Sequence, residues 1–235
     1  MFKKIKVCLI FLTLANKGWV KEMASTIKVV ILGGSGFVGR GLLAELANDQ
    51  RFAITSLSRS GGNAELRHKF PQVTWLQANL QEPTVDWISQ VVQADWIIDL
   101  IGFLFAKNRK TYRQLTITPL QPLIQQLQAT GQTRFIFVSA NKAPFFLKNY
   151  VTVKKEMEQI LREKLGQRTV LLYPGLIYDK DRYSNWLLAQ VLLKLGKIPG
   201  LQQPINTWRI ISRQMFSRQI RQVLLGKSSY LEKRI

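Results

Sequence analysis

The 235-residue sequence contains one cysteine, Cys8, and one histidine, His68. A single cysteine cannot form an internal disulfide or a cysteine-rich zinc site, and a single histidine cannot supply a pair of metal ligands. His68 lies in the polar run 63–69, which predicts a surface residue rather than the base of a Ser-His-Asp hydrolase. We therefore expect no metal centre and no triad hydrolase.

Acidic residues are also scarce, because 14 Asp and Glu face 34 Lys and Arg and the net charge is +20. Such a charge favours an anionic partner: nucleic acid, a membrane surface or a phosphate-bearing small molecule. The basic runs (3–6, 107–110 and 154–155) are short, and no zinc-finger or RNA-recognition signature accompanies them, so nucleic acid is not expected. The other two partners stay open, as does a basic surface that serves only solubility.

Long hydrophobic runs are absent. The longest begins after Lys3, Lys4 and Lys6 and covers 7–15, which is far shorter than the roughly 20 apolar residues that span a bilayer. It is similar to the start of a signal peptide, and Met23 offers a second start. We expect residues 1–22 to be an N-terminal extension, signal-like or a misassigned start, with a membrane anchor as the alternative.

The rest of the chain alternates between short β-branched apolar runs and helical periodicity. This pattern predicts an α/β protein with a parallel sheet covered by helices on both faces, a doubly wound arrangement. We expect strands at 29–32, 52–57, 73–76, 95–101, 134–138 and 169–173. We expect helices at 36–48, 85–92, 111–129 (bent or restarted at Pro119 and Pro122) and 150–165.

The alternation stops after Gly175, where 186–195 and 216–225 are expected to be helical on either side of 196–204. This organisation predicts a nucleotide-binding domain over 23–178 and a small, mostly helical C-terminal cap or substrate region over 179–235.

The most specific motif is the glycine-rich segment 33–39, G-x-x-G-x-x-G, which follows the first strand. A sharp turn requires glycine at the first position, and close approach of the backbone to a pyrophosphate requires it at the second. The third glycine lets the helix lie close to the sheet, and the helix N-terminus stabilises the phosphate charge. The motif predicts a Rossmann-type dinucleotide site formed by Gly33, Ser35, Gly36, Phe37, Val38 and Gly39.

Arg59 follows the second strand, where an NAD-preferring site usually carries an acid against the ribose hydroxyl. A guanidinium at this position can pair with a 2′-phosphate, so we expect NADP(H) as the preferred cofactor. NAD(H) remains the alternative, because Arg59 can equally be an ordinary surface arginine of a basic protein.

Tyr150 and Lys154 are four residues apart and therefore share one helix face. A nearby ammonium lowers the pKa of a phenol, so we expect Tyr150 to be a general acid/base for a carbonyl or alcohol. Lys154 can also bind the nicotinamide ribose. Ser139, at the end of the fifth strand, can hydrogen-bond the substrate or the tyrosine.

With these motifs, residues 28–178 resemble the short-chain dehydrogenase/reductase superfamily, in particular its extended and atypical branches. Those branches include NAD-dependent epimerase/dehydratase-like and complex I accessory subunit-like proteins. The resemblance implies that Asn79 and Leu80 flank the adenine, that Leu100 binds the cofactor after strand four, that Gly102 approaches the nicotinamide ribose, and that Pro174 borders the nicotinamide. The chain departs from the pattern where Asn79 replaces an aspartate and Thr116 an asparagine, and where only ten residues separate Ser139 from Tyr150.

Two classes of function stay open. The first is an NADP(H)-dependent oxidoreductase of the atypical short-chain type, in which Tyr150, Lys154 and Ser139 act on an unidentified small molecule. The second is a non-catalytic NADP(H)-binding sensor or assembly factor; epimerase or dehydratase chemistry on a sugar nucleotide is less favoured. We expect a cytoplasmic protein, with peripheral membrane contact through the apolar and basic residues of 208–227 as a further alternative to a core-packing helix there.

Overall fold

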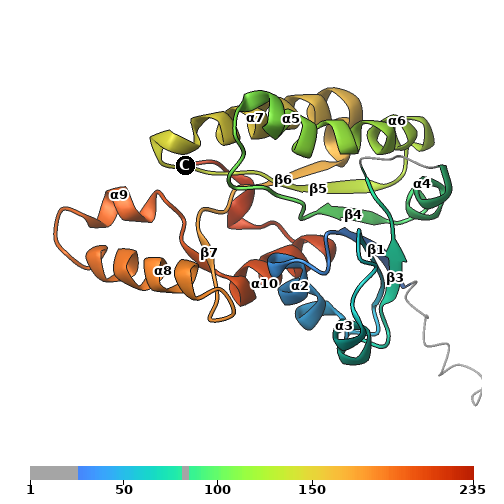
Figure 1. Ribbon diagram of the computed structural model, residues 1–235, viewed down its shortest axis with the longest axis horizontal. Coiled ribbons are helices and arrows are strands. Elements are labelled where there is room, and N and C mark those ends of the chain that lie inside the picture. Colours follow the sequence, from blue (N-terminus) through green and yellow to red (C-terminus); the bar gives the residue numbers. More distant parts are fainter. Residues whose placement is uncertain (1–25, 81–84) are drawn as a thin grey trace, which may run out of the picture.

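The computed structural model describes residues 26–80 and 85–235 of the chain (Figure 1). The expected N-terminal extension, with its signal-like and anchor alternatives, lies outside the described residues.

Six parallel strands form the central sheet, in the spatial order β3-β2-β1-β4-β5-β6. The chain builds the sheet outward from β1 on one side (β2, β3) and then from β4 on the other side (β5, β6), as in a doubly wound Rossmann sheet. This strand order confirms the predicted fold class. The strands are β1 Ile27–Leu32, β2 Phe52–Ser58, β3 Thr74–Gln77, β4 Trp96–Asp99, β5 Arg134–Val138 and β6 Thr169–Leu172.

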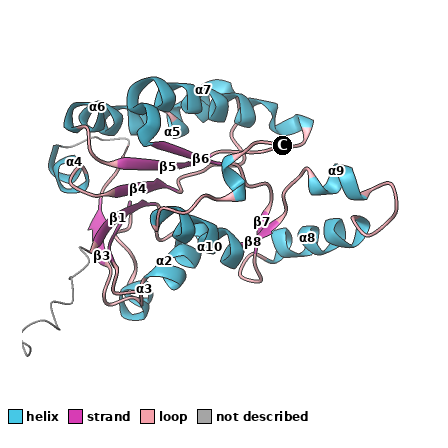
Figure 2. Ribbon diagram, turned by 180° about the vertical axis from the view of Figure 1, so that it is seen from behind, coloured by secondary structure: helices cyan, strands magenta, loops and turns pink. Residues whose placement is uncertain are grey.

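Helices cover both faces of the sheet (Figures 1 and 2). Successive side chains of β1 point to opposite faces, so Val30 and Leu32 join one apolar core while Val29 and Ile31 join the other. The first core is covered by α4 (Val85–Val91), α5 (Arg109–Thr116), α6 (Gln121–Thr130) and α7 (Lys148–Leu165). The second is covered by α2 (Phe37–Leu46), α3 (Ala64–Lys69) and α10 (Arg213–Leu224).

The helix expected over 111–129 is two helices, α5 and α6, joined by the 3-10 turn Thr118–Leu120 that contains Pro119. Helix α3 was not expected, because its sequence is mostly charged. It begins at Asn63, whose side chain accepts a hydrogen bond from the Leu66 amide, and only Leu66 of the helix is buried. His68 is exposed on α3, as predicted.

The C-terminal region is mostly helical, as expected, but it has two parts. The short strands β7 (Ile177–Tyr178) and β8 (Ile211–Ser212) pair with each other, and between them α8 (Tyr183–Leu195) and α9 (Gln202–Asn206) extend away from the sheet (Figure 2). Beyond β8, α10 packs on α2 beneath the sheet. Within the described ranges, no helix is both long and apolar enough to cross a membrane.

Helix α10 contributes to the core with its apolar face. Phe216 and Ile220 are fully buried in the core between α10 and the sheet. Phe216 therefore faces the core, which favours the core-packing alternative for α10, whereas Trp208 and Met215 of the same segment are exposed and peripheral membrane contact stays a prediction.

Candidate dinucleotide and catalytic site

The predicted site residues lie at one edge of the molecule. All six strands are parallel, so the segments that leave their carboxyl ends meet at the same edge of the sheet, and the crevice between β1 and β4 is where such sheets bind ligands. The residues at this edge are Gly33, Ser35, Gly36, Phe37, Val38 and Gly39 after β1, Arg59 after β2, Asn79 and Leu80 after β3, Leu100 and Gly102 after β4, Ser139 after β5 and Pro174 after β6.

The glycine turn has the geometry that its sequence predicts. Gly33 has a φ of 86°, in the left-handed region that favours glycine, and its carbonyl accepts a hydrogen bond from the Gly36 amide at 3.0 Å. A Cβ on Gly39 would lie 2.4 Å from the Gly33 oxygen and 2.5 Å from the Gly34 backbone. Gly36 is the N-cap of α2 and supplies no side chain to satisfy the first amides of the helix. These features form a cradle of backbone amides that fits a pyrophosphate.

A second set of contacts fixes the start of α2. The Arg213 guanidinium lies 4.9 Å from the centre of the Phe37 ring, donates to the Phe37 carbonyl at 3.3 Å, and forms ion pairs with Asp179 at 3.1 Å and Asp181 at 2.7 Å. Arg182 lies over the same ring at 5.4 Å. Sequence reasoning did not find this role of Arg213, because Phe37 and Arg213 are 176 positions apart.

The expected adenosine side of the site follows β2 and β3. Arg59 is exposed, and no ion pair holds it among the described residues. Nearby, the Ser58 hydroxyl is buried without a hydrogen-bond partner in the described part of the chain. Leu80 is buried and Asn79 is half-buried, while Gly102, after β4 on the expected nicotinamide side, faces open space. The donors and the space at this edge fit a dinucleotide.

Tyr150 and Lys154 lie one turn apart on α7, as predicted. Lys154 is only 3% exposed; its Nζ donates to the Val138 carbonyl at 2.8 Å, and lies 4.3 Å from the Phe137 ring centre and 5.9 Å from the Tyr150 ring centre. Tyr150 also packs against Tyr112 of α5, with ring centres 5.9 Å apart. The Lys154 side chain therefore reaches the carboxyl end of β5 from the turn of α7 that follows Tyr150.

The pKa of Tyr150 does not shift in the expected direction. Burial raises the pKa of Tyr150 to about 12, and Tyr112 and the Asp99 carboxylate add to the rise. Burial also lowers the pKa of Lys154, although Asp99 and Glu158 oppose that effect. The expectation that Lys154 brings the phenol toward neutrality is wrong for this structure, and Tyr150 is a neutral phenol at physiological pH.

Asp99, at the end of β4, is a functional candidate that the sequence analysis missed. It is 1% exposed, its Oδ1 accepts from the Ile101 amide at 3.0 Å, and its Oδ2 has no partner among the described residues. Burial raises the pKa of Asp99 to about 6, although Lys154 opposes the rise. The signal in the sequence that could have identified Asp99 is its position: it is an acidic residue at the end of an otherwise apolar strand, next to the expected nucleotide site.

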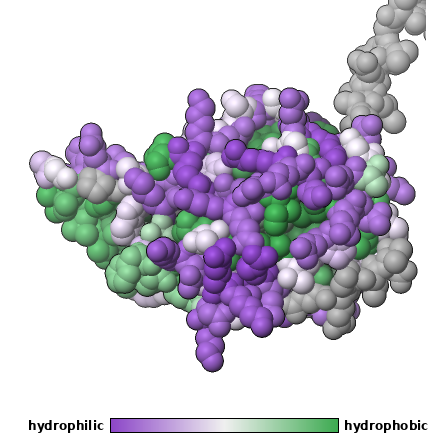
Figure 3. All heavy atoms as spheres, turned by 90° about the horizontal axis from the view of Figure 1, so that it is seen from above, coloured by the Kyte–Doolittle hydropathy of each residue, from purple (hydrophilic) through white to green (hydrophobic). Residues whose placement is uncertain are grey.

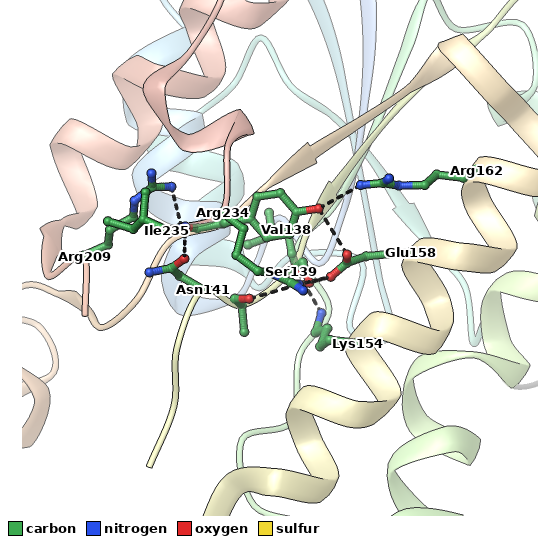
Figure 4. Close-up of polar contacts among 11 residues, drawn as sticks. Val138, Ser139, Asn141, Lys154, Glu158, Arg162, Arg209, Arg234 and Ile235 are labelled. Carbon is green, nitrogen blue, oxygen red and sulfur yellow. Dashed lines mark hydrogen bonds and ion pairs between the residues drawn. The ribbon is translucent and has the colours of Figure 1, made fainter. Parts of the chain in front are cut away.

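Ser139 is turned toward Glu158 (Figure 4). Its hydroxyl donates a short hydrogen bond to Glu158 Oε1, and no hydrogen bond joins it to Tyr150 within the described ranges. Glu158 also accepts from the Tyr173 hydroxyl at 3.1 Å and pairs with Arg234 at 2.5 Å. Glu158 follows Lys154 by one helical turn, so the series 150, 154, 158 on one helix face could have revealed it.

This combination of sheet order, glycine turn and helix N-terminus defines a dinucleotide-binding α/β protein. The chain belongs to the NAD(P)H-binding family, whose model matches residues 33–194. This match confirms the expected class of cofactor, a nicotinamide dinucleotide, and together with the fold it agrees with the resemblance to the atypical short-chain dehydrogenase/reductases.

Comparisons with individual proteins show one related sequence and several similar folds. The chain is 28% identical over 162 residues to an uncharacterized chloroplastic protein of Arabidopsis thaliana, covering 67% of this chain and 53% of the relative, and so spans about half of that protein's length. The oxidoreductase ylbE from Lactococcus lactis has a similar fold, with a TM-score of 0.54 and 20% identity over 65% of this chain and 70% of its own. A short chain dehydrogenase family protein from Francisella tularensis gives a TM-score of 0.58 at 14% identity, over 87% of this chain and 93% of its own.

Proposed function

We propose that the protein is an NADP(H)-dependent oxidoreductase of the atypical short-chain type, which reduces a carbonyl group. The observation that carries the proposal is the Tyr150–Lys154 pair, with its buried ammonium 5.9 Å from the phenol ring and beside the edge where the dinucleotide binds. The preference for NADP(H) over NAD(H) is supported by the exposed Arg59 after β2, where a 2′-phosphate can meet a guanidinium.

Tyr150 is in the protonation state that carbonyl reduction requires, although its raised pKa makes the phenol a weaker acid than a free tyrosine. Because burial keeps Tyr150 protonated at neutral pH, its hydroxyl is able to donate a proton to a carbonyl oxygen that becomes an alcohol. The glycine turn Gly33–Gly39 would hold the cofactor, and the chemistry that a reduced nicotinamide would supply when bound is the hydride for the carbonyl carbon. The Lys154 Nζ lies 5.9 Å from the centre of the Tyr150 ring, and its protonated form would favour the phenolate left after proton transfer.

Turnover by matched tyrosine variants tests this proposal. NADPH consumption by the full chain is measured with a panel of aldehydes and ketones. General acid catalysis contributes on the order of 10²–10⁴-fold, so Tyr150→Phe should lose at least about 100-fold in kcat while NADPH binding is kept. Tyr112→Phe is the control, because its ring packs on Tyr150 but its hydroxyl donates to the Leu104 carbonyl. Full turnover by Tyr150→Phe would refute the role of Tyr150.

The Ser139–Glu158 hydrogen bond favours a second candidate, a protein that binds NADP(H) without turnover as a redox sensor or assembly factor. A serine held by a carboxylate does not present its hydroxyl to a substrate carbonyl. This candidate predicts NADPH binding unchanged in Tyr150→Phe and no reduction of any carbonyl in the panel. A single substrate whose reduction depends on Tyr150 rules it out.

A further inference from the structure

Helix α8 presents an apolar stripe that no described residue covers. Only Ala189 of its thirteen residues is buried, whereas Leu187, Leu188 and Val191 are 47%, 50% and 48% exposed. The exposed stripe recurs at helical spacing on the side opposite Ala189, and consists of Tyr183, Leu187, Leu188, Val191 and Leu195.

The apolar surface continues past the helix. Ile198 and Leu201, between α8 and α9, and Trp208, after α9, are also exposed. Figure 3 shows apolar side chains gathered at the end of the molecule that α8 and α9 form. We call residues 183–208 the α8–α9 arm. A contiguous apolar surface on a projecting arm is typical of an interaction site.

The charge around the arm is of one sign. The α8–α9 arm contains no Asp or Glu and two basic residues, Lys194 and Lys197. Lys194 and Lys197 are exposed next to the stripe. The nearest preceding acids, Asp179 and Asp181, are both paired with Arg213. The surface beside the stripe is therefore complementary to an anionic partner.

We propose that the α8–α9 arm docks on an anionic lipid bilayer, with the apolar stripe in the acyl boundary and Lys194 and Lys197 among the headgroups. An exposed helix with an apolar face and basic neighbours lies in the membrane interface without crossing it. An apolar face alone would suit a protein partner equally well, but an arm of 26 residues with two exposed lysines and no acid favours a uniformly anionic surface. The proposal is independent of whether the dinucleotide site is catalytic.

Vesicle sedimentation of the full chain tests the docking. Vesicles of phosphatidylcholine alone and vesicles containing about 30% phosphatidylglycerol are compared at low and high salt. We expect binding to the anionic vesicles that weakens as salt screens the charges. The variant L187Q/V191Q should weaken this binding about tenfold or more, because two side chains of the stripe no longer favour the acyl boundary.

Charge reversals on two surfaces provide the matched control. Lys194→Glu/Lys197→Glu and Lys110→Glu/Lys164→Glu change the net charge equally, but the second pair lies on α5 and α7. Only the first pair should abolish binding, while circular dichroism reports the same melting temperature for each variant as for the wild type. Equal losses in both charge variants, or binding that L187Q/V191Q leaves intact, would place the contact elsewhere and overturn the proposal. Absence of vesicle binding with a dimer that L187Q/V191Q dissociates would assign the stripe to self-association instead.

Discussion

The hydroxyl of Ser139, at the carboxyl end of β5, donates a hydrogen bond to the buried carboxylate of Glu158 on α7. The same carboxylate accepts from Tyr173, which follows β6, and pairs with Arg234 (Figure 4). One side chain thus joins the ends of two neighbouring strands, a helix and the C-terminal segment. We therefore expect Glu158 to contribute to the stability of the fold, independently of any role at the nucleotide site.

Removal of the Glu158 carboxylate should destabilise the fold. Glu158→Ala leaves the Ser139 and Tyr173 hydroxyls and the Arg234 guanidinium without their acceptor, and breaking such a buried pair costs about 3 kcal/mol. Denaturant unfolding should show a reduced midpoint with a similar slope. Glu163→Ala is the control on the same helix, because Glu163 is exposed, and its change should stay within about 0.5 kcal/mol. Equal effects of the two variants would show that the Glu158 contacts contribute nothing.

The buried Asp99 predicts a pH dependence of stability. Its pKa rises from 3.8 to about 6 on folding, so between these values the folded state binds more protons than the unfolded state. Stability should therefore fall as pH rises from about 4 to about 6, by on the order of 2 kcal/mol, and level off above that range. Asp99→Asn, which does not titrate, should flatten this decline in urea unfolding measured across the range. A decline of the same size in Asp99→Asn would assign it to other groups.

Arg59 should decide between the two dinucleotides. If its guanidinium meets the 2′-phosphate, Arg59→Ala loses a charge-assisted contact and the Kd for NADPH rises about tenfold or more, whereas the Kd for NADH is unchanged. Lys69→Ala is the control, because it removes one exposed positive charge from the adjacent α3. Titration calorimetry with both dinucleotides makes the comparison. An equal loss of affinity for NADH would mean that Arg59 acts through the fold or through the overall electrostatic potential, and not on the 2′-phosphate.

The parts of the fold that sequence predicted well are those that local chemistry determines. The six strands and the glycine turn follow from β-branched runs and from glycine spacing, and the break between α5 and α6 follows from Pro119. The carboxyl-edge position of Ser139 and Arg59 then follows from the parallel order of the strands.

Long-range pairing was not predictable from the same patterns. Arg213 fixes Phe37 across 176 positions, and nothing in the sequence near either residue indicates it. Spacing placed Tyr150 and Lys154 on one helix face, but it could not show that the Lys154 ammonium donates to Val138 or that burial raises the pKa of the phenol. The Lys154 hydrogen bond and the raised pKa of Tyr150 both depend on how completely α5 and the sheet bury these two side chains.

The central claim is that a nicotinamide dinucleotide binds on the backbone of the glycine turn, and the NADPH binding isotherm of Gly39→Ala tests it most directly. A Cβ at this position would lie 2.4 Å from the Gly33 oxygen, so the turn must open and the cradle is lost. We predict saturable NADPH binding by the wild type and by the exposed control Ala44→Ser, and loss of binding by a folded Gly39→Ala. Unchanged NADPH affinity in Gly39→Ala would contradict the account.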